Sequence, residues 1–292
     1  MQDGLLGGVE RVVFRSGSVR IGAFRCEPSH PKFRNSGPAN NYFFVFPRTA
    51  VEIQHEHERP FVANPNIVTF YNHGQAYERD VISAEGDRCE WFAVDLDIVQ
   101  DVVRSVDPAV DSRPEKPFRF ARGWSDAPTY LLQRRIFERV ISGVNGDALA
   151  IEESVIGLLE RVVHLAFGVP LTRPVQAPDS RQRDAVHYAE HLLSKRWADE
   201  LTLQSIACQT GISVYHLCRV FRRMTGTTLH QYRHNLRLRS SLEGVIESDR
   251  SLVDIALDAG FSSHSHFTNS FRREFAETPS RLRVQRPGNR NA

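Results

Sequence analysis

One stretch, GFSSHSHFTNSFRREF (residues 260–275), combines regularly spaced aromatic residues with side chains that form hydrogen bonds. Phe267, Phe271 and Phe275 recur every four residues, which predicts the buried stripe of a helix. An α-helix fits the major groove of B-DNA, where asparagine can bond to adenine, and arginine to guanine or phosphate. The polar residues on the other face of this helix could do that chemistry: His264, Ser265, Thr268, Asn269 and Arg272.

The same arrangement occurs once more, earlier in the chain. Residues 203–226 resemble residues 252–276, with an alanine, a glycine four residues later, and then an amphipathic stretch. The offset is 49 residues up to the glycines and 50 residues after them, so one copy carries an insertion. We expect the second helix of the first copy to bury Leu217, Val220, Phe221 and Met224. Its polar face carries Tyr215, Cys218, Arg219 and Arg222.

Each copy has the features of a helix-turn-helix. Gly211 and Gly260 can adopt a positive φ and end the first helix. A serine then serves as N-cap of the second helix, Ser213 in one copy and Ser262 in the other. We therefore predict reading helices over 213–224 and 263–275. For a single copy an ordinary solvated helix face would be an equal alternative, but two tandem copies favour DNA reading.

The segment between the copies supports this interpretation. Residues 228–249 predict a connecting helix that buries Leu229, Tyr232, Leu236, Leu242 and Ile246. About twenty helical residues span ~30 Å, and major-groove faces on one side of DNA are ~34 Å apart. One chain could therefore place both reading helices in successive major grooves.

Charge is distributed unevenly along the chain. Residues 181–292 have a net charge of +6 and residues 1–180 a net charge of −4. A basic segment indicates a polyanion as partner for the C-terminal part alone, with uneven surface charge as the simpler alternative.

The N-terminal part has a different pattern. Residues 10–95 contain short runs of Val, Ile, Phe and Tyr between turn residues, which predict the strands of a sandwich or small barrel. Residues 129–142 and 147–167 have the spacing of amphipathic helices. Three prolines between positions 170 and 178 then predict a stiff linker.

The C-terminal pattern resembles the AraC family of bacterial transcription regulators. The resemblance covers residues 183–286 and rests on both helix-turn-helix units and on the signature DIALDAGFSSHSHFTNSFRREFAETPSRLR. It places Tyr215, Cys218 and Arg219 where the first reading helix contacts bases. In the second helix it places His264, Ser265, Thr268 and Asn269 on the DNA face. Cys218 and Asn269 depart from the pattern, since long polar or basic side chains often occupy these positions.

The resemblance also implies a plan for the whole chain, because members of this length usually carry an N-terminal cupin-like β-barrel and dimerisation helices. We therefore expect a two-domain α and β fold with an all-α C-terminal domain. The expected parts are a cupin-like effector domain (1–126), dimerisation helices (127–169), a linker (170–182), the DNA-binding domain (183–286) and a tail (287–292). The expected partners are double-stranded DNA, an unidentified small-molecule effector, a second copy in a homodimer, and RNA polymerase if the protein is an activator.

Candidate ligand residues lie on the predicted strands. Tyr42, Tyr71, His73 and Trp91 combine aromatic surface with polar groups, as ligand pockets do. Plain core packing is the alternative for these aromatic residues.

Metal sites are weaker candidates. His55 and His57 have the HxH spacing that cupins use for metal, and His73 could be a third ligand. A solvated turn is the favoured interpretation of this histidine pair. Cys26 and Cys89 could act as a thiol-based sensor or bind a metal ion together with His30, but buried apolar roles are favoured. We predict neither a metal nor a cofactor.

Other classes of protein receive little support. The chain has no P-loop, GxSxG or HExxH motif, so we do not expect an enzyme. An enzyme with a cupin metal site and a structural DNA-bridging protein are the remaining alternatives. No apolar run approaches the ~18 residues of a membrane span, no secretory signal is evident, and the four cysteines are scattered. We expect a cytoplasmic protein without membrane segments.

Overall fold

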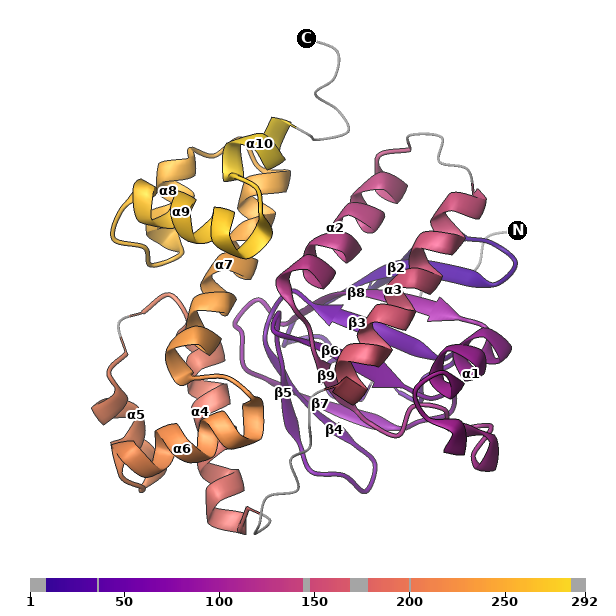
Figure 1. Ribbon diagram of the computed structural model, residues 1–292, viewed down its shortest axis with the longest axis horizontal. Helices are drawn as coiled ribbons and strands as arrows, with labels where there is room; N and C mark the ends of the chain where they lie inside the picture. The colour runs from indigo at the N-terminus through magenta and orange to yellow at the C-terminus, as the bar shows by residue number, and fades with distance from the viewer. Residues whose placement is uncertain (1–8, 36, 144–147, 169–177, 200, 285–292) are drawn as a thin grey trace. The chain divides into compact units, whose positions relative to one another are not determined.

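The computed structural model describes residues 9–35, 37–143, 148–168, 178–199 and 201–284. They fall into two compact units, one within residues 1–168 and one within residues 169–290 (Figure 1). The first unit contains all the described strands and three α-helices, and the second unit contains only helices. The predicted combination of a sheet-rich N-terminal part and an all-α C-terminal part is confirmed. Most of the predicted linker (170–182) and all of the predicted tail (287–292) lie outside the described residues.

The strands of the first unit form two sheets, and every recorded strand pairing is antiparallel. The six-stranded sheet has the order β1 (Glu10–Arg15), β2 (Val19–Cys26), β8 (Asp87–Val94), β3 (Phe43–Pro47), β6 (Ile67–Tyr71) and β9 (Arg122–Trp124). The three-stranded sheet has the order β5 (Phe61–Ala63), β4 (Val51–His55) and β7 (Tyr77–Val81).

The two sheets share a buried core. Val51 and Ile53 of β4 and Phe61 of β5 belong to one apolar cluster with Ile67 of β6. The described strands pair only within their own sheets, so the predicted β-barrel is not closed by hydrogen bonds and consists of two packed sheets. Alternating apolar residues defined the strands, but they do not specify which strand edges pair. The sandwich alternative fits these two sheets better.

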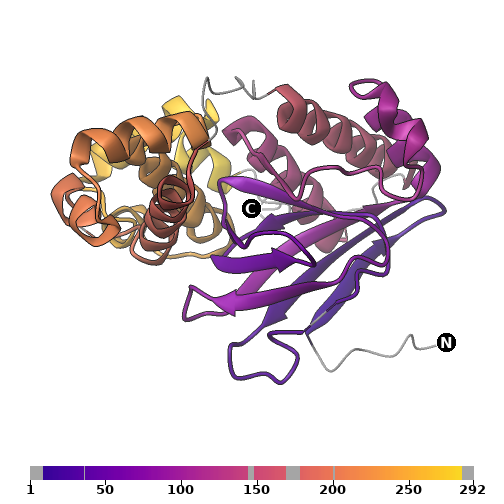
Figure 2. The same cartoon turned by 90° about the horizontal axis from the view of Figure 1, so that it is seen from below.

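Three helices accompany the sheets, namely α1 (Leu96–Arg104), α2 (Ala127–Ile141) and α3 (Ala148–Gly168), and a 3-10 helix spans Pro108–Ser112. The Asp126 side chain caps α2 by accepting a hydrogen bond from the Thr129 N–H at 2.8 Å. Helix α3 lies close to β9, where a Cβ at Gly123 would lie 2.8 Å from the Ala166 Cβ. The two long helices therefore cover the six-stranded sheet (Figures 1 and 2).

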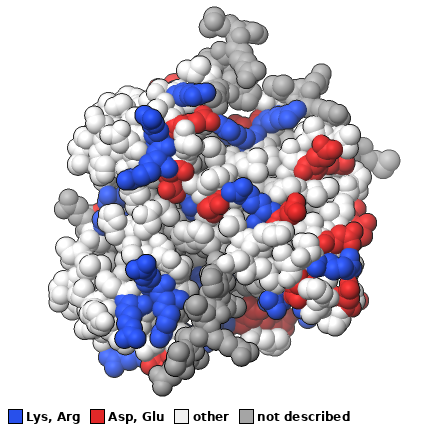
Figure 3. All heavy atoms as spheres, in the orientation of Figure 1, with Lys and Arg blue, Asp and Glu red and all other residues white. Residues whose placement is uncertain are grey.

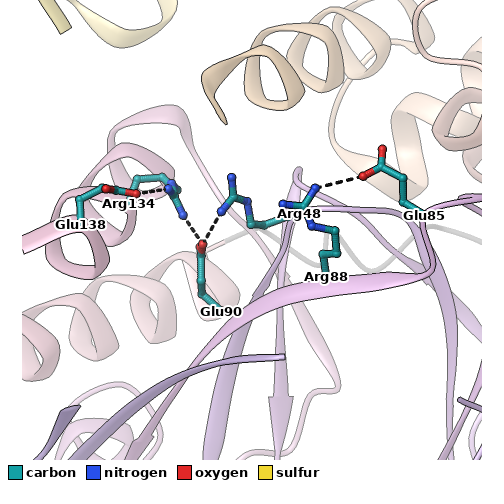
Figure 4. Close-up of polar contacts among 6 residues, drawn as sticks. All are labelled: Arg48, Glu85, Arg88, Glu90, Arg134 and Glu138. Carbon is teal, nitrogen blue, oxygen red and sulfur yellow. Dashed lines mark hydrogen bonds and ion pairs between the residues drawn. The ribbon is translucent and has the colours of Figure 1, made fainter. Parts of the chain in front are cut away.

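A buried ion-pair network fastens α2 to this sheet (Figure 4). The Glu90 carboxylate of β8 accepts hydrogen bonds from Arg134 of α2 and from Arg48, the latter at 2.9 Å. Arg134 also pairs with Glu138 one turn along α2. Burial alone would raise the pKa of Glu90, but the two guanidinium groups outweigh it and hold the pKa below its ordinary value. Glu90 is therefore a charged group inside the fold.

The second unit contains seven helices among its described residues. Each of the first six begins after a side chain that accepts a backbone N–H, which satisfies part of the helix start. The helices are α4 (Ser180–Lys195), α5 (Leu203–Thr210), α6 (Val214–Thr225), α7 (Leu229–Glu247), α8 (Leu252–Asp258), α9 (His264–Phe275) and α10 (Pro279–Val284).

Candidate nucleic-acid interface

The first helix-turn-helix consists of α5 and α6. Helix α5 ends at Gly211, which has φ = 69° and donates its N–H to the Ala207 carbonyl at 3.0 Å. Ser213 then caps α6 by accepting the His216 N–H. Helix α6 buries Leu217, Val220 and Phe221 as predicted. The prediction for Met224 is wrong, because this side chain is exposed on the last turn of α6.

The second helix-turn-helix consists of α8 and α9, and the segment from its glycine to the start of the second helix is one residue longer than in the first copy. The predicted N-cap Ser262 is wrong, because Ser263 caps α9 by accepting the His266 N–H at 3.1 Å. The offset of 50 residues after the insertion already maps Ser213 onto Ser263, so the signal was present in the sequence. The inserted residue lies in the turn and leaves the capped start of the helix unchanged.

Gly260 is required in this turn for two reasons. Its φ is 73°, which L-residues with a side chain rarely adopt. A Cβ there would also lie 2.4 Å from the Ala198 carbonyl oxygen and 2.8 Å from the Arg237 Nη2. Gly226 has the same conformation, with φ = 75°, but no atom lies within 4 Å of its would-be Cβ. Substitutions at these two positions therefore separate the free-energy cost of a positive φ from the free-energy cost of a steric clash.

We expect Gly260→Ala to destabilise the second unit more than Gly226→Ala. Both substitutions cost about 1–2 kcal/mol for the left-handed conformation, and Gly260→Ala adds about 1–3 kcal/mol because the backbone must move. Urea unfolding of the full-length variants, followed by helical circular dichroism, measures both. Equal losses in the free energy of unfolding would show that the close approach to Ala198 contributes nothing to the effect of Gly260→Ala.

The outer face of α6 is open. Tyr215 is 75% exposed, and Arg219 and Arg222 are exposed as well, while Cys218 is half-buried. The side chains of Arg219 and Arg222 form no hydrogen bond or ion pair with another described residue. Arg223 differs, because it donates to Gln182 of α4. Figure 3 shows Lys and Arg side chains gathered over this part of the second unit.

The outer face of α9 carries the remaining predicted residues. His264, Ser265, Asn269 and Arg272 are exposed, and Thr268 is half-buried with its hydroxyl 3.4 Å from the His264 Nε2. The phenylalanines behind this face are buried, and the Phe271 ring lies 5.5 Å from that of Phe267 and 4.6 Å from that of Phe275. The aromatic stripe is therefore part of the core, and the polar face is exposed to solvent.

Helix α7 packs against both helix-turn-helix motifs of the second unit. All five apolar residues predicted to be buried on it are buried: Leu229, Tyr232, Leu236, Leu242 and Ile246. The Tyr232 ring packs edge-on against Phe221 of α6 at 5.4 Å. On the other side, Arg237 donates to the carbonyls of Trp197 at 2.8 Å and Ala198 at 2.9 Å, next to Gly260. These contacts hold the two helix-turn-helix units in one scaffold.

The first unit contains a pocket of about 310 Å³ between its two sheets. Tyr71 and Trp91 line this pocket, as predicted for ligand residues. Tyr42 and His73 do not line it: the Tyr42 hydroxyl donates to the Glu115 carbonyl at 3.4 Å, and His73 is exposed.

Several wall residues were missed in the sequence, chiefly Arg79, Asp87 and Cys89. Burial was favoured for Cys89, but charged residues in a strand usually face solvent, so nothing in the sequence indicated that Arg79 and Asp87 face inward.

The fold separates the candidate histidine pair, whereas Cys26 and Cys89 lie on the neighbouring paired strands β2 and β8. His55 is buried beside Gln75 at 2.8 Å, and burial lowers its pKa to about 4. His57 lies in a turn with φ = 66° and is exposed, so the same-side geometry of a strand does not apply. Cys26 is buried, and burial raises the pKa values of both Cys26 and Cys89. Within the described residues no three His, Cys, Asp or Glu side chains are placed to hold a metal ion.

Among the helices that the structure describes, none is both long and apolar enough to cross a membrane.

Similarity to known proteins shows which family this chain belongs to. Residues 186–285 match the family described as "Helix-turn-helix domain". "Probable transcription factor PqrA" from Proteus vulgaris is 39% identical over 83 residues, which are 28% of this chain and 68% of that protein. The chain belongs to the AraC family of transcription regulators. The resemblance seen in the sequence is thereby confirmed.

Other relatives share this second unit of the AraC-family chain. "HTH-type transcriptional activator RhaS" from Escherichia coli is 36% identical over 96 residues, or 33% of this chain, and the match spans only 34% of RhaS. A solved AraC-type regulator from Chromobacterium violaceum is 30% identical with a TM-score of 0.34, covering 37% of this chain and 97% of that one. ToxT from Vibrio cholerae is 12% identical with a TM-score of 0.36, covering 93% of this chain and 100% of ToxT.

Proposed function

We propose that this AraC-family regulator binds specific DNA sites by placing α6 and α9 in two successive major grooves. One observation carries the proposal: two capped helices with open polar faces are fixed on a single connecting helix, α7. The 19 residues of α7 span about 30 Å, close to the ~34 Å between major-groove faces on one side of DNA.

The side chains on these faces suit different parts of DNA. Arg219 can bond bidentately to guanine, and Asn269 to adenine. Arg222 and Arg272 lie further along their helices and suit phosphates, which position a protein without reading sequence. The remaining contact residues of the proposal are Tyr215, Cys218, His264, Ser265 and Thr268.

Arg219→Ala should weaken binding to the specific site by about 1–3 kcal/mol, with a smaller effect on random DNA, because a base contact is lost. Arg222→Ala on the same helix is the matched control, and it should weaken both kinds of binding alike. Fluorescence anisotropy with both DNAs at one salt concentration measures the difference. If Arg219→Ala weakens both equally, Arg219 does not read a base.

We propose further that the first unit binds a small-molecule effector in the pocket between its sheets. Tyr71 and Trp91 line the pocket, and its mixture of aromatic and polar walls is typical of ligand sites. An effector that changes DNA affinity tenfold needs only ~1.4 kcal/mol of coupling between the two sites.

A homodimer through α2 and α3 is the remaining part of the proposal. Leu132 and Ile141 of α2 and Leu149 of α3 are exposed apolar side chains on these helices. We expect a dimer in sedimentation at micromolar concentration and a shift toward monomer for Ile141→Glu. Val253→Glu, at an exposed apolar residue of the other unit, should leave the dimer intact. A monomeric wild-type chain would exclude this assembly.

Because the RhaS relatives are named activators, RNA polymerase is the proposed protein partner, and a DNA-bound regulator would act in the cytoplasm.

A further inference from the structure

The pocket wall carries equal numbers of positively and negatively charged residues. Arg79 of β7 is 2% exposed, and its Nη1 lies 3.1 Å from the Asp87 Oδ2 of β8. The guanidinium also lies 4.4 Å from the centre of the Phe24 ring, so an aromatic face stabilises it as well. The other charged residues of the wall are Lys32 and Glu10, again one of each sign. The pocket therefore has no net formal charge to attract an ion.

A charged ligand would be poorly accommodated in such a pocket. A carboxylate placed beside Arg79 would also lie near Asp87, and an amine beside Asp87 would lie near Arg79. Either ligand group would lose its hydration on entering the pocket and would gain no unpaired counter-charge in return. That transfer is unfavourable in a low-dielectric site. An uncharged ligand avoids this penalty.

The wall also contains buried donors without acceptors. Trp91 is 7% exposed, and its indole Nε1 has no hydrogen-bond partner among the described residues, nor has the Arg79 Nε. The indole is held in place, because it covers Gly22 of β2, where a Cβ would lie 2.4 Å from its Cε2. It also meets the Phe43 ring edge-on at 5.4 Å. A fixed, unpaired N–H at a pocket wall favours a ligand that supplies an acceptor.

From these features, and on the basis of the effector site proposed above, we infer that the pocket binds an uncharged small molecule with an aromatic or apolar body and an acceptor oxygen, such as an amide or ketone carbonyl. Its volume lies at the low end of the ~300–1,000 Å³ that ligand pockets usually have. The aromatic walls suit the body of such a molecule, and Trp91 and Arg79 supply the donors.

Calorimetry on the full-length protein tests the inference with four naphthalene probes that differ in one group: naphthamide, naphthoate, naphthylmethylamine and methylnaphthalene. We expect naphthamide to bind at least about tenfold more tightly than each of the others. Naphthoate or the amine binding as tightly as naphthamide, or all four binding alike, would overturn the inference. So would the absence of binding by all four at millimolar concentration.

Trp91→Phe tests the donor, because it removes the N–H and keeps an aromatic ring. We expect about fivefold weaker binding of naphthamide and unchanged binding of methylnaphthalene. Trp124→Phe, on β9 and outside the pocket wall, should change neither value. An unchanged naphthamide affinity in Trp91→Phe would remove Trp91 from the site.

Specific DNA binding by the same preparations separates the two proposals. Naphthoate preference with intact DNA binding overturns only the ligand class. Loss of all probe binding with intact DNA binding also overturns the effector pocket and leaves the DNA-reading proposal standing. A failure to bind specific DNA contradicts the proposed function itself, whatever the probes show.

Discussion

Arg134→Ala is expected to lower the free energy of unfolding of the first unit by about 3–5 kcal/mol, since removal of one partner of a buried ion pair leaves the other charge poorly compensated. Glu90 would keep only Arg48 beside it, in a position where its carboxylate is almost fully buried. Thermal and urea unfolding of the full-length protein measure the loss. Arg139→Ala, at an exposed arginine on the same helix, should stay within about 0.5 kcal/mol of the wild type.

The double variant Arg134→Met with Glu90→Gln should recover part of that loss, because it removes the almost fully buried carboxylate charge, while Arg48 and Glu138, which each lose one partner, are partly exposed. The pKa of Glu90 is held below 4.5 in the folded state. Its contribution to stability is therefore present above pH 4.5 and is lost as the pH falls through the lowered value. Equal losses for Arg134→Ala and Arg139→Ala, or a loss that does not change with pH in this acidic range, would contradict the role of the network.

Phe271→Ala should destabilise the second unit by about 3–5 kcal/mol, because it opens a cavity between α9 and its neighbours. Phe271 is fully buried and its ring contacts those of Phe267 and Phe275. Unfolding of the full-length variant, followed by helical circular dichroism, measures the effect.

Asn269→Ala is the matched control for Phe271→Ala. Its side chain is exposed on the same helix, so we expect unchanged stability but weaker specific DNA binding. A small loss for Phe271→Ala, or a large one for Asn269→Ala, would reverse our assignment of the buried and open faces.

The two helix-turn-helix motifs and the helix that connects them could be predicted closely from sequence, because their signals are local. Helical spacing marked the buried stripe, and glycine and serine marked the turns. The errors were local too: extending the 49-residue offset of the glycines to the cap predicts Ser262, whereas the inserted residue lies within the turn and makes Ser263 the N-cap. Met224 has the spacing of a buried residue, but it lies on the last turn of α6, where the core ends.

The first unit was less predictable, because its features depend on which strands become neighbours. The composition of residues 10–95 indicated the strands there but not β9, and the pairing of strand edges is encoded by no local pattern. Arg79 and Asp87 lie on adjacent segments of the chain but on strands of different sheets, and their pairing makes both side chains compatible with burial. The solvated turn favoured for the histidine pair is confirmed for His57, whose φ is positive, but it is wrong for His55, which is buried at the end of β4.

Methylation interference on a site selected from random DNA tests most directly whether α6 and α9 occupy successive major grooves, since guanine N7 lies in the major groove. We expect two clusters of interfering guanines on one face of the duplex, separated by about 10–10.5 base pairs per bound chain. Arg219→Ala should remove interference in one cluster and leave the other. A single cluster, or two clusters half a turn apart, would show that the two helices do not read successive grooves.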